Sequence, residues 1–193
     1  FFRKKKKSSK NELAYLKKIK IKTKLISVEN DNVDRASQLT QKTNQFNFNT
    51  KRYKIADIKK LKKNHLCFLV KLSDIYGYHG IVSFFILKKN KEILIVDLFL
   101  MSCRIMGRYL ENWILSEIKK IAITNKKKDI LFEFIPTKKN KDLINNFIKL
   151  NNLKKITKKK IEEKNLKLEN KSKAEYYILN TKQKITNLEI YEK

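Results

Sequence analysis

Residues suited to binding a phosphate stand together where a predicted strand meets a predicted helix. Arg104, Gly107 and Arg108 follow the apolar run 93–100, which is typical of a buried strand. Apolar residues then recur at helical spacing and predict an amphipathic helix over 107–124. A strand that gives way to a helix at a glycine leaves several backbone N–H groups unpaired, and these groups form an anion site together with the helix dipole. Because guanidinium groups pair well with phosphate, the sequence predicts a phosphate site at this junction.

Three further residues are candidates for catalysis. Cys103 adjoins the same predicted helix start and an arginine, a setting that can activate a thiol, so it is either a thioester-carrying nucleophile or a small buried residue. His79 stands beside a glycine and is either a turn residue or a general base. Glu133 lies on a predicted strand and is either a second base or part of a solvated strand face.

A run of short amides interrupts the pattern between two predicted helices. Asn44, Gln45 and Asn47 either hold a hydroxyl or carboxylate of a substrate, or cap a turn by bonding to nearby backbone. The residue types alone leave both interpretations open.

Hydrophobic periodicity predicts the elements that must position these residues. Strands are expected at 19–25, 66–72, 81–87, 93–100, 129–135, 153–156, 165–168 and 175–179, and helices at 12–20, 33–40, 55–63, 107–124 and 141–150. The segment 74–80 is expected to be a turn. This order predicts an α/β (α+β) domain in which a mixed central sheet is flanked by helices.

The spacing Arg104-x-x-Gly107-x resembles the pyrophosphate loop of the GNAT acetyltransferase superfamily, and the element order matches that fold. Tyr109 departs from the family pattern, which has Gly or Ala there. The resemblance implies that backbone N–H groups of Arg104, Ile105, Met106, Gly107, Arg108 and Tyr109 bind the phosphates of coenzyme A or phosphopantetheine. It also implies that Met101 and Ser102 lie along the pantetheine arm, in a gap where two strands splay apart.

A wider set of motifs resembles the C-terminal GNAT-like domain of FkbH-like proteins, in the haloacid-dehalogenase (HAD) superfamily, subfamily IIIC. The motifs are TQKTNQFN at 40–47, MSCR at 101–104, and Pro136-Thr137 with Asn140. In that family a HAD domain precedes the GNAT-like domain, and glyceryl units are loaded onto an acyl carrier protein in secondary-metabolite or surface-glycan biosynthesis. The resemblance implies an acyl carrier protein and an upstream HAD domain as partners, substrate contacts from Asn44, Gln45 and Asn47, and a cofactor contact from Asn140.

Two features limit the activity that the resemblance implies. The aspartate pair of HAD chemistry is missing from the sequence, so this chain alone is expected to show no phosphatase activity. The tyrosine that many GNAT enzymes use as a general acid is replaced, because Ile148 follows Phe147. A docking domain without catalysis is therefore the alternative to an acyltransferase domain.

The net charge of +28 permits a third interpretation, a nucleic-acid-binding module. The 47 basic residues include only five arginines, and the lysines are scattered, which favours a compositional origin and no specific nucleic-acid partner. The charge also suits an acidic carrier protein. The two cysteines form no metal or redox motif, so no bound metal is expected. Few cysteines and apolar runs too short to span a membrane lead us to expect a cytoplasmic protein with no membrane partner.

The chain is expected to be a fragment of the two-domain layout, because it begins with Phe1. Residues 1–18 are predicted to be a charged linker from a missing upstream domain. The GNAT-like domain is predicted at 19–180, and a C-terminal tail at 181–193.

Overall fold

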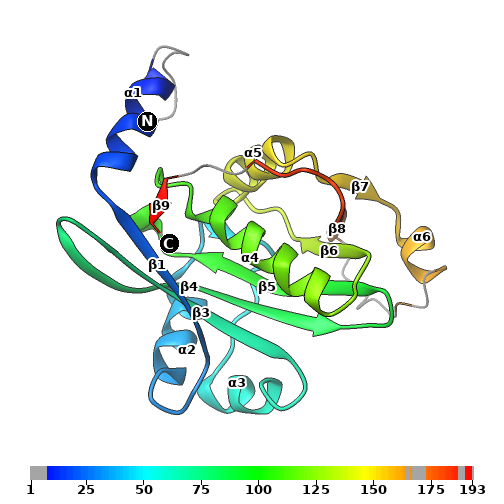
Figure 1. Ribbon diagram of the computed structural model, residues 1–193. Coiled ribbons are helices and arrows are strands. Elements are labelled where there is room, and N and C mark those ends of the chain that lie inside the picture. Colours follow the sequence, from blue (N-terminus) through cyan, green and yellow to red (C-terminus); the bar gives the residue numbers. More distant parts are fainter. Residues whose placement is uncertain (1–7, 164–165, 167–172, 187–189, 193) are drawn as a thin grey trace.

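A mixed sheet runs through the structure (Figure 1). The computed structural model describes residues 8–163, 166, 173–186 and 190–192. The strands within them are β1 Ile21–Ser27, β2 Phe46–Asn47, β3 Leu66–Asp74, β4 Gly77–Lys89, β5 Ile93–Met101, β6 Asp129–Phe134, β7 Lys154–Ile156, β8 Glu175–Asn180 and β9 Tyr191–Glu192. Their main order is β7-β8-β6-β5-β4-β3-β1-β9, and β2 pairs with β5 off this path. The β5–β6 and β1–β9 pairs are parallel, whereas the others are antiparallel.

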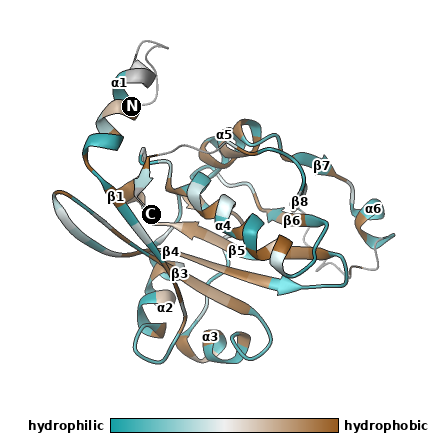
Figure 2. Cartoon of the chain, in the orientation of Figure 1, coloured by the Kyte–Doolittle hydropathy of each residue, from teal (hydrophilic) through white to brown (hydrophobic). Residues whose placement is uncertain are grey.

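Helices cover both faces of the sheet (Figure 1). They are α1 Ser8–Lys18, α2 Val33–Lys42, α3 Ile55–Leu61, α4 Leu110–Thr124, α5 Lys141–Leu150 and α6 Lys158–Glu162. α2 and α3 bury Ala36 and Ile58 against one face, and α4 and α5 bury Ile114 and Phe147 against the other. Figure 2 shows hydrophobic residues concentrated along the central strands, while the helices alternate between hydrophobic and hydrophilic residues, as amphipathic helices do.

The central strand β5 has a β-bulge at Asp97. Leu87 of β4 pairs with Val96 and Ile86 pairs with Leu98, so Asp97 faces no residue of β4. A bulge adds one residue and bends the strand locally. The pairing of β5 with β6 ends at Val96, one residue before the bulge, and the ends of these two strands then diverge.

The chain itself fills the gap between the diverging ends of β5 and β6. We call residues 46–48 the β2 segment. Its first residue pairs with Met101 of β5, and its last, Phe48, donates its N–H to the carbonyl of Phe99 at 3.1 Å. The carbonyl of Phe48 accepts the N–H of Ile135, just beyond β6, at 2.8 Å. The structure therefore corrects the expectation that Met101 and Ser102 adjoin an open gap for a pantetheine arm, because the β2 segment occupies the gap.

Most predicted elements are present with shifted ends, and α5 has the predicted bounds. The helix predicted from Gly107 begins instead at Leu110, because the 3₁₀ turn η1, Cys103–Ile105, and a left-handed Tyr109 precede it. β4 begins at Gly77, inside the segment predicted to be a turn. β2, α6 and β9 were not predicted from the sequence, and the strand predicted at 165–168 lies outside the described residues, apart from residue 166.

Residues beyond both ends of the predicted 19–180 domain pack into its core. Leu16 of α1 is 3% exposed and Ile190 is 4% exposed, and both belong to the core on the α4 side of the sheet. β9 also pairs with β1. The packed part of the chain is therefore longer than the segment 19–180.

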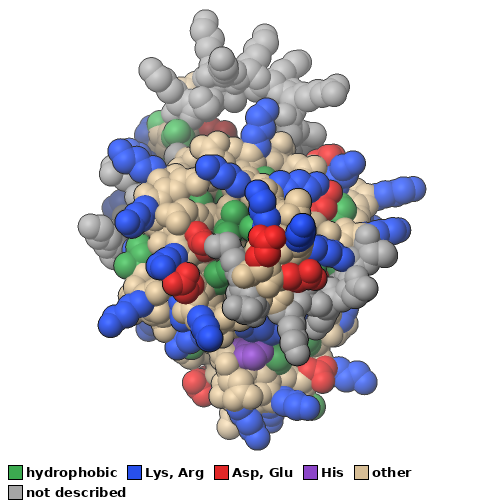
Figure 3. Space-filling model, turned by 90° about the vertical axis from the view of Figure 1, so that its right-hand side faces the viewer, with side chains coloured by type: hydrophobic (Ala, Val, Ile, Leu, Met, Phe, Trp, Pro, Cys, Tyr) green, Lys and Arg blue, Asp and Glu red, His purple; other side chains and the backbone are tan. Residues whose placement is uncertain are grey.

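Lysine and arginine side chains are scattered over the face seen in Figure 3, with aspartate and glutamate side chains between them. This distribution differs from the continuous basic stripe that is typical of a nucleic-acid interface.

Candidate functional site

The loop between β5 and α4 contains two residues with left-handed backbone. Gly107 has φ +83° and Tyr109 has φ +54°, next to the first residue of α4. Three loop amides are already used, because Ile105, Met106 and Arg108 donate to loop carbonyls at 3.2–3.3 Å. Among the described residues, none accepts from the amide of Gly107. The predicted cradle of amides is thus smaller than expected, and it lies beside the positive end of α4.

The two arginines of this loop point to different places. Arg104 is exposed, and its Nε donates to the hydroxyl of Ser102 at 3.4 Å. Arg108 instead binds the carboxylate of Asp74 with its Nη2 at 3.1 Å, and the Nε2 of His79 lies 2.9 Å from the same oxygen. Burial would raise the pKa of Asp74, but the N–H of Tyr76, His79 and Arg108 together hold this pKa below its usual value. The guanidinium of Arg108 is therefore engaged by a buried carboxylate, which corrects its predicted contact with phosphate.

An apolar cavity of about 220 Å³ adjoins this loop. Glu12 and Glu111 are its acidic residues, and the hydroxyl of Tyr109 donates to Glu12 at 3.3 Å. Burial raises the pKa of Glu111. The other lining residues are Phe46, Met101, Met106, Gly107, Leu143, Asn146, Phe147 and Leu150. This lining suits an uncharged chain better than a pyrophosphate.

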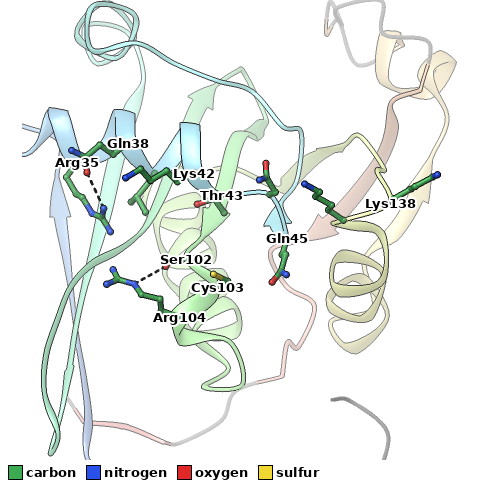
Figure 4. Close-up of a pocket in the computed structure, with 12 residues that line it drawn as sticks. Arg35, Gln38, Lys42, Thr43, Gln45, Ser102, Cys103, Arg104 and Lys138 are labelled. Atoms are coloured by element: carbon green, nitrogen blue, oxygen red, sulfur yellow. Dashed lines mark hydrogen bonds between the residues drawn. The ribbon is translucent and has the colours of Figure 1, made fainter.

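A second, basic cavity of about 760 Å³ lies on the α2 side of the sheet (Figure 4). Five cationic side chains line it, from Arg35, Lys42, Arg104, Lys138 and Lys139. The remaining lining residues are Gln38, Leu39, Thr43, Asn44, Gln45, Ser102 and Cys103. Figure 4 shows α2 along one side, the Ser102–Arg104 turn on another, and Lys138 across from them. The cavity can therefore hold an anion.

The β2 segment and the end of β5 form a wall between the two cavities. Successive side chains of an extended strand point to opposite faces. Gln45 and Ser102 therefore line the basic cavity, whereas Phe46 and Met101 line the apolar one. Phe46 and Met101 are 3% and 1% exposed, so the wall is closely packed. The residues that the sequence analysis joined in one site are thus divided between two cavities on opposite sides of the sheet.

The three predicted catalytic residues do not come together. Cys103 is exposed and lines the basic cavity. His79 lies in the β3–β4 hairpin beside Asp74 and lines neither cavity. Glu133 is on β6 opposite Tyr176 and also lines neither cavity. Of the three candidates, only Cys103 therefore lines one of these two cavities.

Two predicted ligand contacts turn out to be structural, and a third is inaccessible. Asn47 and Asn140 are both fully buried, and the Nδ2 of Asn140 donates to the carbonyl of Asn47 at 2.8 Å. The Oδ1 of Asn47 accepts the N–H of Thr50 at 2.9 Å, as in the capped-turn interpretation. Ile105 is buried in the core as well, and its N–H is used within the loop. Asn44 and Gln45 line the basic cavity and stay accessible.

A charged cluster around Asp97 was missed by the sequence analysis. Asp97 is 4% exposed, and its Oδ1 lies 2.6 Å from Lys51 and 2.7 Å from Lys88. The hydroxyl of Tyr53 donates to Oδ2 at 3.0 Å. Burial would raise the pKa of Asp97, but the two lysines outweigh burial and hold it below its usual value. The sequence did hold a signal for this cluster, because an aspartate within the apolar run 93–100 needs a buried partner.

Within the part of the chain that the structure describes, no cluster of three or more His, Cys, Asp or Glu side chains is arranged to hold a metal ion. Among the helices of this part, none is both long and apolar enough to cross a bilayer.

The comparisons with known proteins identify the fold. No protein-family model and no curated protein matches the chain. Solved structures do match it, among them a domain from Methanocaldococcus jannaschii, which is 11% identical with a TM-score of 0.60 and covers 83% of this chain and 99% of that chain. A GNAT-family acetyltransferase from Staphylococcus aureus is 11% identical with a TM-score of 0.59, over 82% of this chain and 99% of its own. The ribosomal-protein-S18-alanine N-acetyltransferase from Escherichia coli is 11% identical with a TM-score of 0.57, over 88% and 99%.

These matches confirm the predicted fold class. The chain has the GNAT acetyltransferase fold, a mixed α/β architecture with a mostly antiparallel central sheet between helices. At this level of identity the likeness concerns the fold alone.

Proposed function

We propose that this domain binds coenzyme A, or the phosphopantetheine arm of an acyl carrier protein, and assists the transfer of an acyl or glyceryl group. The fold suggests acyl transfer that depends on an acyl thioester, since solved structures of this fold include several acetyltransferases. The FkbH-like motifs favour a carrier protein and an upstream HAD domain as partners. The soluble carrier that this role requires favours a cytoplasmic location.

The observation that carries this proposal is the loop at the start of α4. The amide of Gly107 has no acceptor among the described residues, and it lies next to the N-terminus of a 15-residue helix. Such an amide and the helix dipole attract a phosphate. The adjoining apolar cavity suits the uncharged pantetheine chain, and Asn146 supplies an amide for it. The bound thioester would supply the acyl group, while the protein fixes its position.

Three observations favour a second candidate, a docking domain without catalysis. The β2 segment closes the gap between β5 and β6. Glu12 and Glu111 repel phosphate from the apolar cavity. Ile148 stands where the resemblance expects the tyrosine acid, and it is 8% exposed.

A pair of matched variants tests the role of the loop. A Cβ added at Gly107 meets no heavy atom within 4 Å, and Asn and Asp both tolerate its positive φ. Gly107→Asp adds a charge that opposes phosphate, whereas Gly107→Asn has the same size and no charge. In calorimetric titrations with coenzyme A, the Asp variant should bind at least tenfold more weakly, about 1.4 kcal/mol, and the Asn variant within about threefold of the original chain. Equal affinities for the two folded variants would remove the loop from the site.

Mass spectrometry separates the two candidates. The chain is incubated with acetyl-coenzyme A or with an acylated carrier protein, and the intact masses of all components are followed. Movement of the acyl group supports the transferase. Binding with no movement beyond the background without protein supports the docking domain.

A further inference from the structure

The basic cavity lies apart from the loop of Gly107. We propose that it binds a small polyanion, either a phosphate ester or a compound with several carboxylates. This inference does not depend on the transfer function proposed above, because the cavity lies on the opposite side of the β2 segment from the loop of Gly107.

The lining of the cavity has uncompensated positive charge. Its five cationic side chains are accompanied by no carboxylate. No ion pair joins any of these five to a residue that the structure describes. The charges of Arg35 and Arg104 also act on each other, since burial and then the nearby Arg104 lower the pKa of Arg35. Positive groups held around a hollow without a counter-ion favour an anionic ligand.

The arginines of the chain are concentrated at this cavity. The sequence has only five arginines among 47 basic residues, and two of them, Arg35 and Arg104, line the cavity. A third, Arg52, donates to the carbonyl of Thr43 at 2.8 Å and to the side chain of Asn44, and so supports two further lining residues. A composition dominated by lysine does not account for this grouping. Guanidinium groups bind phosphate and carboxylate with two parallel hydrogen bonds, which lysine cannot do.

Of the two arginines that line the cavity, Arg35 is held in place by hydrogen bonds and Arg104 is available to bind a ligand. The Nε and Nη2 of Arg35 donate to the carbonyl of Ile81 at 3.2 and 3.0 Å, and its Nη1 donates to Gln38 at 3.3 Å. Arg104 has one described side-chain partner, the hydroxyl of Ser102. In Figure 4 both guanidinium groups extend to the same end of the cavity. A ligand that bridges the two would replace their mutual repulsion by two charge-assisted contacts.

Size and polarity define the ligand class. A cavity of about 760 Å³ lies within the range of small-molecule sites. Its neutral lining consists of amides, hydroxyls and a thiol, with Leu39 as the aliphatic side chain, so it does not suit a long acyl chain. A compact molecule with two or more anionic groups fits both properties. The phosphate of a phosphopantetheine arm has the same chemistry, and the experiment must distinguish it from a free small molecule.

The experiment is a calorimetric titration with inorganic pyrophosphate, citrate, 4′-phosphopantetheine and pantetheine. Arg104→Gln removes an exposed charge and should weaken pyrophosphate or citrate binding at least fivefold. Arg104→Lys keeps the charge but loses the paired donors, and it should restore part of the affinity. The double variant Lys138→Gln/Lys139→Gln should also weaken binding, while Lys59→Gln/Lys60→Gln, which removes two exposed charges on α3, should change it less than twofold.

The outcomes decide between the sources of the anion. Tighter binding of pyrophosphate or citrate than of 4′-phosphopantetheine supports a free small polyanion. The reverse order, with 4′-phosphopantetheine binding weakened by Arg104→Gln, supports the carrier arm at the same cavity. The proposal is overturned if none of the anions binds at millimolar concentration, or if the cavity and control variants weaken binding equally. It is also overturned if duplex DNA binds with the same dependence on Arg104 and excess pyrophosphate fails to displace it. The effect of Arg104→Gln on pyrophosphate binding should be the same in the Gly107→Asp background as in the original chain, whereas Gly107→Asp alone weakens coenzyme A binding, so failure of the loop proposal is distinguishable from failure of this one.

Discussion

Replacing Asn140 with alanine should loosen the wall between the two cavities. The Nδ2 of Asn140 donates to the buried carbonyl of Asn47 at 2.8 Å and to the carbonyl of Ile135 at 3.0 Å. Its Oδ1 accepts the N–H and the hydroxyl of Thr137 at 2.6 and 2.9 Å. Thr137 is half-buried, so its N–H and hydroxyl can bind water when the Asn140 side chain is removed. The lost free energy therefore comes mainly from the carbonyls of Asn47 and Ile135, which lose their donor. At about 1–1.5 kcal/mol for each of these bonds, Asn140→Ala should lower the free energy of unfolding by about 2–3 kcal/mol.

Urea denaturation measures the change in the free energy of unfolding. A decrease of this size corresponds to a fall in Tm of about 5–10 °C for a chain of this length. Amide hydrogen exchange locates it, since the N–H of Phe48 and the N–H of Ile135 both belong to the ladder that Asn140 supports. Exchange at these amides should accelerate more than exchange within β3 and β4.

Asn125→Ala is the matched control. The Nδ2 of Asn125 makes one hydrogen bond, of 2.8 Å, to the carbonyl of Ile121 at the half-buried end of α4. Its loss should cost less than about 1 kcal/mol. Equal losses in the two variants, or unchanged exchange at Phe48 in Asn140→Ala, would refute the argument that Asn140 holds the wall.

Two further predictions concern charge. Asp97→Asn should lower the free energy of unfolding by about 3 kcal/mol at pH 7, because Lys51 and Lys88 lose their buried partner. Folding lowers the pKa of Asp97, so its contribution is complete above the unfolded value of about 3.9 and is lost as pH falls through the folded value. The difference in stability between the two proteins should therefore begin to shrink only below about pH 4. The net charge of +28 should give weak duplex DNA binding that falls steeply with salt and does not depend on base sequence, as measured by fluorescence anisotropy, and a tight, sequence-selective complex would contradict the compositional origin of the charge.

Hydrophobic periodicity in the sequence predicted many of the helices and strands. The segment 141–150 repeats apolar residues at helical spacing, and it forms α5 with Ile144 and Phe147 buried. The run 93–100 is apolar on both faces, as expected for a central strand with helices on each side. Local patterns of this kind are set by burial, so they survive in a chain whose identity to its structural neighbours is near 11%.

The candidate site depended on long-range contacts that local patterns do not encode. Arg108 is adjacent to Gly107 in sequence, but its partner Asp74 is 34 residues away. Strand β2 has only two paired residues, too few for a strand signal in the sequence. Phe46 and Phe48 of the β2 segment pack in the core, where the segment fills the gap between the ends of β5 and β6. The residues that the motifs joined in one predicted site are therefore divided between two cavities.

For the proposed acyl transfer, the wall formed by the β2 segment separates two places where a donor could bind. The rings of Phe46 and Phe48 pack against Phe99 and Phe147 with centroids 5.1–5.8 Å apart. Moving the segment out would expose two phenylalanines, at about 2–3 kcal/mol each, and break its hydrogen bonds to both strands. A thioester in the apolar cavity therefore does not meet the exposed thiol of Cys103 while the wall is closed. A donor whose phosphate lies in the basic cavity does meet it, because Cys103 lines that cavity. Arg104→Gln and Gly107→Asp thus report on opposite sides of the sheet, and the variant that slows acyl movement identifies the side on which the donor binds.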